Sequence, residues 1–180
     1  MTTYARYTVN GTVTHGILDG EVLKEISNSP LEDYSETGNT HSVSEVKLLS
    51  PTDPSKVVAI GLNYKSHLGG RPGPKAPEPF LKASTTVIAQ DENIVIPKVA
   101  LDEGVNIQPE AELAIVIGKE CKGASQSNAL DYVFGYTCGN DVSARDWQQN
   151  DLQWARAKSS DTFGPIGPWM TTDLDPTNIQ

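Results

Sequence analysis

The sequence predicts an α+β fold in which strands dominate, and three observations carry this prediction. Near the N-terminus, short alternating segments are separated by Asn-Gly and Asp-Gly pairs, which are strong hairpin signals. Farther along, the runs 109–118 and 132–141 are largely apolar and rich in β-branched or aromatic residues, which favours buried strands. Helical patterns are short, the clearest covering 142–149. A chain of 180 residues can bury one good core, so one domain is the default.

Residues 1–50 are expected to form a small N-terminal β unit. Turns at Asn10-Gly11 and Asp19-Gly20 divide its first part into three alternating segments, which predicts a three-stranded meander. Residues 27–45 are rich in Ser, Asn, Thr and Pro and are expected to be a connector. The expected strands are Tyr4–Val9, Thr12–Leu18 and Glu21–Ile26.

Residues 51–180 are expected to form the larger unit, which carries the candidate chemistry. A strand at Val57–Ile60 opens it, and Asn63 is positioned to cap a short helix that carries His67. The glycines and prolines of residues 69–79 then predict a loop directly after that histidine.

Two carboxylates lie two residues apart at the start of the run 109–118. Side chains alternate on a strand, so Glu110 and Glu112 are expected on the same face. Two inward-facing carboxylates repel each other unless a cation or hydrogen-bond donors compensate. A hard cation such as Mg2+, Mn2+ or Ca2+ is the simplest compensator, because these ions prefer carboxylate oxygens. The alternative is an edge strand whose two glutamates face water.

A third carboxylate favours the metal interpretation. Asp141 ends the second strand-like run and precedes the short helix, which Asp141 or Ser143 is expected to cap. A carboxylate at a strand end, beside a carboxylate pair, is also what an octahedral oxygen site requires. The alternative role of Asp141 is that of a helix cap alone.

Composition narrows the class of protein. The net charge of −9 and the isoelectric point of about 4.7 argue against nucleic acid as a partner, because phosphate binding needs a basic surface. Only two cysteines are present, which fits a reducing compartment, and Cys138 is expected to be a small buried residue. The N-terminus has no apolar segment typical of a secretory signal, and no run approaches the roughly 18 apolar residues that span a bilayer. We therefore expect a cytoplasmic enzyme without a membrane partner.

Six ordered blocks in the second unit resemble the fumarylacetoacetate hydrolase superfamily. They appear in the order and at about the spacing of that family and span most of residues 50–172. Any one block is weak evidence, but the ordered set is highly specific. The blocks are GLNYKSH (61–67), PFLK (79–82), EAEL (110–113), GYT (135–137), NDVSARD (140–146) and KSSDTFGPIGPW (158–169).

The resemblance implies a mixed β-sheet roll and a hydrolase that cleaves carbon–carbon bonds in β-diketo acids such as acylpyruvates. It implies a divalent metal, Mg2+ or else Mn2+ or Ca2+, held by Glu110, Glu112 and Asp141. With such an ion present, His67 is expected to act as general base on water. Lys158 is expected to offset the negative charge that develops on the leaving group.

Three further residues are implied at the substrate. Arg145 and Gln148 are expected to help seat the keto-acid carboxylate, and Lys82 is expected to line the same cavity. The resemblance also implies a homodimer. If the C-terminal third of the family's catalytic domain is missing, apolar strands are left uncovered, and this gives a physical reason for pairing with a second chain.

Two departures from the family pattern keep alternatives open. The catalytic domain of the family normally continues beyond the last block, so residues 51–180 are expected to lack its C-terminal third. Several hydrolytic members have a glutamate three residues after the histidine, where this chain has Gly70; Glu78 is the substitute that the loop offers. Decarboxylation or isomerisation of related keto acids, and a truncated metal-binding subunit without activity, are therefore alternatives to hydrolysis.

Overall fold

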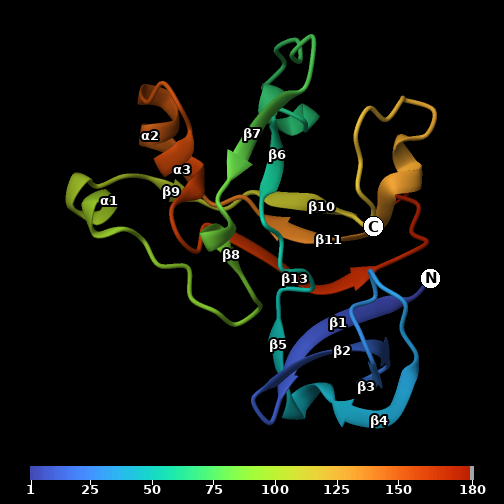
Figure 1. The fold of residues 1–180 in the computed structure, drawn as a ribbon. Helices are drawn as coiled ribbons and strands as arrows, with labels where there is room; N and C mark the ends of the chain where they lie inside the picture. Colours follow the sequence, from blue (N-terminus) through green and yellow to red (C-terminus); the bar gives the residue numbers. More distant parts are fainter. Residues whose placement is uncertain (179–180) are drawn as a thin grey trace.

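The computed structural model describes residues 1–178, and its largest element is one mixed β-sheet. In this part of the chain the sheet has nine strands. Seven follow the order β10-β11-β13-β1-β2-β3-β4, while β5 pairs with β1 and β8 with β13. Among the described strands of this sheet, β8 and β13 are the one parallel pair. The short helices α1, α2 and α3 lie together at one end of the molecule (Figure 1). The predicted strand-dominated α+β class is confirmed.

The bounds of the elements are as follows. The strands are β1 (Thr3–Val9), β2 (Thr12–Asp19), β3 (Val22–Ile26), β4 (Glu36–Ser42), β5 (Lys47–Leu49), β6 (Val57–Gly61), β7 (Glu78–Lys82), β8 (Val87–Ile88), β9 (Ile107–Gln108), β10 (Ala111–Ile117), β11 (Val133–Asn140), β12 (Ser143–Ala144) and β13 (Gly164–Thr171). The α-helices are α1 (Lys98–Glu103), α2 (Arg145–Asn150) and α3 (Ala155–Ser159). Short 3-10 helices are η1 (Val43–Glu45), η2 (Lys65–Leu68), η3 (Ser84–Thr86) and η4 (Ala129–Tyr132).

The N-terminal meander is confirmed as β1, β2 and β3. Asn10 and Gly11 both have positive φ angles, 49° and 79°, which the two-residue hairpin turn requires. The connector expected at 27–45 was wrong in part, because β4 forms within it. The strand β4 forms because of a tertiary contact: the Glu25 carboxylate on β3 accepts hydrogen bonds from three alternate residues of β4, namely Thr37, Asn39 and His41.

The N-terminal strands and the later strands belong to the same sheet. β1 pairs with β2 on one side and with β13 on the other, where Tyr4 faces Met170. Tyr4, Ile26 and Met170 form a buried cluster across this junction. Figure 1 shows β1 and β13 side by side between the two ends of the sheet. The expected division near residue 50 stays a prediction about domains, and its end point at 180 lies outside the described residues.

The strand β10 lies at the edge of the sheet among the described residues. Its residues alternate, and Leu113, Ile115 and Ile117 are 37%, 53% and 54% exposed. The expectation that this run is buried was therefore wrong for one of its two faces, because among the described residues nothing packs over the side of the sheet to which Leu113, Ile115 and Ile117 project. Cys138, which pairs with Leu113 on the same open face, is exposed rather than buried.

A separate two-stranded sheet, β6 with β7, stands beside the helices and carries the loop 62–77 at its far end. The η2 helix in this loop is capped by Tyr64 without a side-chain hydrogen bond, so the expected cap at Asn63 was wrong. The cap expected for α2 was also wrong: its first residue is preceded by Ala144, and Ser143 points elsewhere. No helix in residues 1–178 is long and apolar enough to cross a membrane.

Candidate metal and substrate site

Two facing rows of alternating residues build the candidate site. Gln108, Glu110 and Glu112 occupy every second position along β9 and the start of β10. Across from them, Ser143 pairs with Gln108, and the Asp141 amide donates to the Glu110 carbonyl oxygen at 2.9 Å. Because side chains alternate on extended chain, this register brings the carboxylates of Glu110 and Asp141 to one side. Both residues are buried.

The ammonium group of Lys158 joins the two rows. Its Nζ atom lies 2.6 Å from Glu110 Oε2 and 2.6 Å from Asp141 Oδ2. It also donates to Ser143 Oγ at 2.5 Å. The α3 helix places Lys158 here, and only 2% of the residue is exposed. A buried ammonium with three oxygen partners is well compensated, which is the condition under which a charge is tolerated inside a protein.

A second lysine enters from β7. Lys82 Nζ lies 2.6 Å from Asp141 Oδ1 and also donates to the carbonyl oxygen of Lys158. Burial lowers the pKa of Lys82, and the charge of Asp141 opposes that effect. Asp141 thus binds a lysine on each of its oxygens.

Arg145 closes the other side of the site. Its Nη1 atom lies 2.6 Å from Glu110 Oε1 and 2.8 Å from Gln148 Oε1, while Nε donates to Gln108 Oε1 at 2.8 Å. Burial by itself raises the pKa of Glu110, but the hydrogen bonds and charges of Lys158 and Arg145 outweigh burial and bring the pKa down to about 2. Glu110 is therefore an anion held between two cations.

Glu112 differs from the other two carboxylates. No ion pair of Glu112 occurs within residues 1–178, and burial together with the charges of Asp141 and Glu110 raises its pKa. A hydrogen bond with Tyr64 opposes this rise, and the Tyr64 hydroxyl also accepts from the Leu113 amide at 3.0 Å. Three carboxylates that crowd one another, one of them without a cation, form a donor set that suits a hard divalent ion.

The carboxylates are nevertheless not arranged as a finished metal cage. Over residues 1–178, no group of three or more Asp, Glu, His or Cys side chains has a geometry that could hold a metal ion. Lys158 lies between Glu110 and Asp141, so a lysine ammonium holds their oxygens together. The donor chemistry fits a divalent ion, and the ligand roles of Glu110, Glu112 and Asp141 stay predictions.

The site residues predicted from the sequence lie together in the structure, with the exception of His67. Lys82, Glu110, Asp141, Arg145, Gln148 and Lys158 form one connected network, and Glu112 lies beside it. His67 is exposed on η2, and its ring makes no hydrogen bond or ion pair with the part of the chain that is described. No hydrogen-bonding group among the described residues orients the His67 ring, so its role as general base stays a prediction.

Sequence reasoning missed Ser143 and Gln108, which bind Lys158 and Arg145. The signal was present: Ser143 lies two residues after Asp141, and Gln108 two residues before Glu110. The same alternation that placed Glu110 and Glu112 on one face extends to both.

Comparison with known protein families gives two matches. Residues 56–180 match the family model described as fumarylacetoacetate (FAA) hydrolase C-terminal, and residues 3–51 match a model described as Rv2993c-like, N-terminal. Protein Rv2993c of Mycobacterium tuberculosis is 44% identical over 177 residues, which cover 91% of this chain and 64% of that protein. The chain thus spans about two thirds or less of the length of the first curated relatives that it matches.

Three of the similar proteins are named for three different activities. A mitochondrial protein of Xenopus laevis named oxaloacetate tautomerase fahd2 is 39% identical over 170 residues, covering 89% of this chain and 50% of that one. The crystal structure of 2-hydroxyhepta-2,4-diene-1,7-dioate isomerase from Mycobacterium marinum matches with a TM-score of 0.85 at 38% identity, covering 98% of this chain and 68% of that one.

A third relative was crystallised with a metal. The structure of maleylpyruvate hydrolase from Sphingobium sp. SYK-6, in complex with manganese (II) ion and pyruvate, matches with a TM-score of 0.71 at 26% identity. It covers 96% of this chain and 67% of that one. Because the family model spans well over half of the residues, the chain belongs to the fumarylacetoacetate hydrolase family, a family of enzymes that includes hydrolases, isomerases and a tautomerase.

Proposed function

We propose that this chain is the metal- and substrate-binding part of an enzyme that moves a proton on 2-oxo acids, as in tautomerisation or isomerisation. The observation that carries the proposal is the buried Lys158 ammonium, 2.6 Å from both Glu110 and Asp141. A buried ammonium so placed can stabilise the negative charge that develops on the substrate oxygen when a proton leaves the carbon of a 2-oxo acid.

The residues divide the work in the following way. Arg145, held in place by Gln108 and Gln148, presents a planar guanidinium that suits a carboxylate of the substrate. Lys158 neutralises negative charge that develops on the substrate oxygen during proton transfer.

Glu110, Glu112 and Asp141 would hold Mg2+ or Mn2+, and a bound ion would polarise the keto oxygen as a Lewis acid. The unpaired Glu112, with its raised pKa, supports the need for such a cation. The manganese in the maleylpyruvate hydrolase relative supports the choice of a divalent ion.

Hydrolysis of a carbon–carbon bond in β-diketo acids is the second candidate. It is supported by the relatives named as hydrolases. It requires a base that activates water, and in this chain His67 is exposed while Gly70 takes the place of an orienting glutamate. Tautomerisation breaks a C–H bond and forms an O–H bond on the same substrate, so it consumes no activated water, and we rank tautomerisation or isomerisation first.

One set of assays tests this ranking. Oxaloacetate is added to the purified chain; its enol absorbance reports tautomerisation, and the release of pyruvate reports decarboxylation. Acetylpyruvate is the substrate that tests hydrolysis. Each assay is run with and without Mg2+ or Mn2+. We expect metal-dependent tautomerisation that Lys158→Met reduces at least a hundredfold and that Lys119→Met, an exposed control, leaves unchanged. Hydrolysis of acetylpyruvate without tautomerisation of oxaloacetate would reverse the ranking.

We also propose that the chain pairs with a second copy of itself through the outer face of β6 and β7. There Val58 pairs with Leu81 and Ile60 with Pro79, and all four side chains are exposed. Val58 and Leu81 are 55% and 64% exposed. Apolar faces of this kind are typical of protein interfaces.

Light scattering at micromolar concentration tests the dimer. We expect twice the mass of 19.4 kDa for the wild type and for Leu130→Glu, a change at an exposed leucine on η4. We expect a monomer for Leu81→Glu. A wild type that stays a monomer would overturn the dimer.

A further inference from the structure

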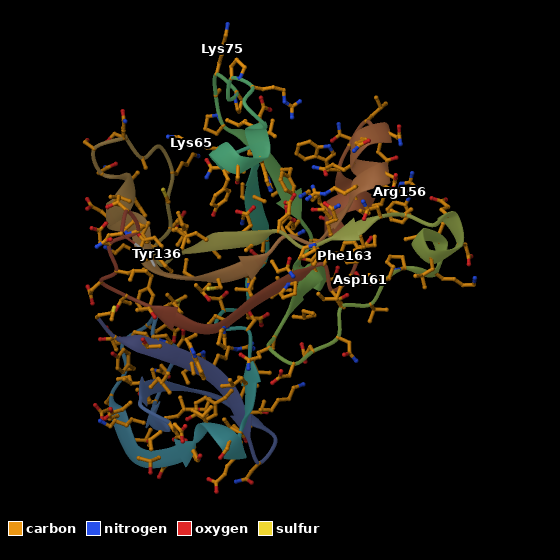
Figure 2. All side chains as sticks on the ribbon, turned by 180° about the vertical axis from the view of Figure 1, so that it is seen from behind. Lys65, Lys75, Tyr136, Arg156, Asp161 and Phe163 are labelled. Atoms are coloured by element: carbon orange, nitrogen blue, oxygen red, sulfur yellow. The ribbon has the colours of Figure 1, made fainter. Side chains whose placement is uncertain are left out.

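A small cavity with two aromatic walls lies beside the candidate site, between β7 and the segment 151–154 that joins α2 to α3. Its volume is about 160 Å3, and it opens to solvent at Leu152, which is fully exposed. Figure 1 shows α3 beside β7, and Figure 2 shows the same two elements from behind, with Arg156 labelled on α3. The cavity is lined by Glu78, Pro79 and Phe80 of β7 and by Leu152, Gln153 and Trp154.

Phe80 belongs both to this cavity and to the candidate site. Glu78, Phe80 and Lys82 occupy alternate positions on β7, so their side chains project to the same face of that strand. From that face, Lys82 binds Asp141. The Lys158 ammonium nitrogen lies 5.6 Å from the centroid of the Phe80 ring. A substrate whose keto oxygen approaches Lys158 therefore lies next to Phe80, and the group at its other end has the cavity within reach.

The second aromatic wall, Trp154, is held in place by the chain around it. Its ring lies at 83° to the Phe80 ring with the centroids 5.2 Å apart, which is a favourable edge-to-face arrangement. It also packs on Gly61, where an added Cβ atom would come within 3.0 Å of the indole ring. Because Gly61 pairs with Glu78, the indole covers the same face of the β6–β7 sheet as Phe80. The Trp154 carbonyl oxygen accepts the Lys158 amide at 2.9 Å, so one helical turn fixes both the ring and the lysine.

The volume and the walls of the cavity suit one aromatic ring. A protein cavity of about 150 Å3 with apolar walls binds benzene, and this cavity is of comparable size. A bound ring would cover the exposed Leu152 and contact Phe80 and Trp154. It would gain both from the removal of apolar surface from water and from ring–ring contacts.

The charge at the cavity disfavours a second carboxylate. Glu78 lines it, and none of the described residues that line it carries a positive charge. A carboxylate in the cavity would therefore meet the Glu78 carboxylate without a cation to compensate. The edge of an aromatic ring carries partial positive charge and is compatible with a neighbouring carboxylate.

We propose that this cavity is the subsite for the tail of the substrate, and that the tail is an aromatic ring rather than a second carboxylate. The inference rests on the proposed function and names its substrate class: 2-oxo acids with an aryl substituent. The carboxylate of such an acid binds Arg145, its keto oxygen lies at Lys158, and its ring packs against Phe80, Trp154 and Leu152.

Three ligands that differ in one group test this subsite. 2-Oxobutanoate, 2-oxo-4-phenylbutanoate and 2-oxoglutarate share a four-carbon 2-oxo acid and carry hydrogen, phenyl or carboxylate on the fourth carbon. Their affinities are measured by isothermal titration calorimetry in the presence of Mg2+, because tautomerisation only returns each ligand to its keto–enol equilibrium. We expect the wild type to bind the phenyl compound roughly tenfold or more tightly than 2-oxobutanoate, and to bind 2-oxoglutarate no more tightly than 2-oxobutanoate.

Two variants at the cavity separate its apolar wall from its charge. Leu152→Ala removes a side chain that is fully exposed in the free protein, so the fold loses little. It should weaken the phenyl compound roughly threefold or more and leave the other two ligands unchanged. Glu78→Gln should strengthen 2-oxoglutarate roughly threefold or more and leave 2-oxobutanoate unchanged. Leu130→Ala, at an exposed leucine on η4, is the control and should bind all three ligands as the wild type does.

The outcomes distinguish this subsite from the proposed function. The subsite is overturned, and the proposed function left intact, if the wild type binds the phenyl compound no more tightly than 2-oxobutanoate, or if Leu152→Ala weakens both equally. A changed mass of Leu152→Ala in light scattering, with unchanged affinities, would assign the cavity to a contact between two copies and also overturn the subsite. If no ligand binds the wild type, the subsite is overturned, and the oxaloacetate assay decides separately whether the chain has activity. A phenyl preference that depends on Leu152, in a chain without tautomerase activity, would support the subsite and overturn the proposed function alone.

Discussion

Lys158 and Glu110 lie 48 residues apart in the chain, yet the Lys158 ammonium nitrogen is 2.6 Å from Glu110 Oε2 in the buried centre of the site. This ion pair fixes the end of α3 to the start of β10. Removing the ammonium would leave Glu110 and Asp141 as neighbouring buried anions with fewer cations between them.

We therefore expect Lys158→Met to destabilise the metal-free chain by about 3–5 kcal/mol, the range for breaking a buried ion pair from one side. Urea unfolding gives the free energy of unfolding. Adding Mg2+ should restore part of the loss, because a divalent ion can replace the missing charge. A variant as stable as the wild type would mean that the network does not hold the site together.

Glu112→Gln should have the opposite effect on stability and a negative effect on metal binding. Its carboxylate faces Asp141 and Glu110, and burial together with these charges raises its pKa, so a neutral side chain relieves repulsion. We expect a melting temperature equal to or a few degrees above that of the wild type without metal. Mn2+ affinity, followed by electron paramagnetic resonance, should fall at least tenfold. Glu120→Gln, at an exposed position, is the control and should change neither value.

Arg145→Lys tests whether the planar guanidinium matters beyond its charge. Arg145 contacts Glu110, Gln108 and Gln148 at once, and an ammonium cannot reproduce that set of bonds. The expected result is a KM for oxaloacetate raised about tenfold or more, with a smaller change in kcat. An unchanged KM would place the substrate carboxylate elsewhere.

The stability of the N-terminal unit should depend on pH through His15. This half-buried side chain lies opposite Arg6 on β1, and burial followed by the Arg6 charge lowers its pKa below the ordinary value of about 6.5. The unfolded chain then binds the proton at a higher pH than the folded chain. Stability is therefore full above about pH 6.5 and decreases as the pH falls below that value.

Urea unfolding between pH 5 and pH 7.5 measures this effect. His15→Gln should flatten the change of the unfolding free energy with pH over that range. The same slope in both proteins would show that His15 does not contribute.

Much of the fold followed from local sequence. Asn10-Gly11 and Asp19-Gly20 set two hairpins, and both lie where expected. The strand β4 did not follow, because Thr37, Asn39 and His41 have a polar sequence and depend on one carboxylate, Glu25, for their place. Tertiary hydrogen bonds outweighed local preference there.

The candidate site was predictable in part for a similar reason. Alternation placed Glu110 and Glu112 together, and the ordered blocks added Asp141, Lys158 and Arg145. The depth at which Lys158 enters between Glu110 and Asp141 depends on the docking of α3 against β7, which no local pattern encodes. Cys138 was misjudged because burial on a sheet depends on what covers its face, and the strand sequence looks the same in either case.

The location of a bound Mn2+ ion tests most directly whether Glu110, Glu112 and Asp141 hold a metal. Crystals of the chain soaked in Mn2+ are measured at the manganese absorption edge, where anomalous scattering identifies the ion. We expect one ion within about 2.0–2.6 Å of oxygens from Glu110, Glu112 and Asp141, with the Lys158 ammonium displaced from between the carboxylates. Mn2+ bound elsewhere, or a site in which Lys158 still joins Glu110 and Asp141 at saturating Mn2+, would contradict it.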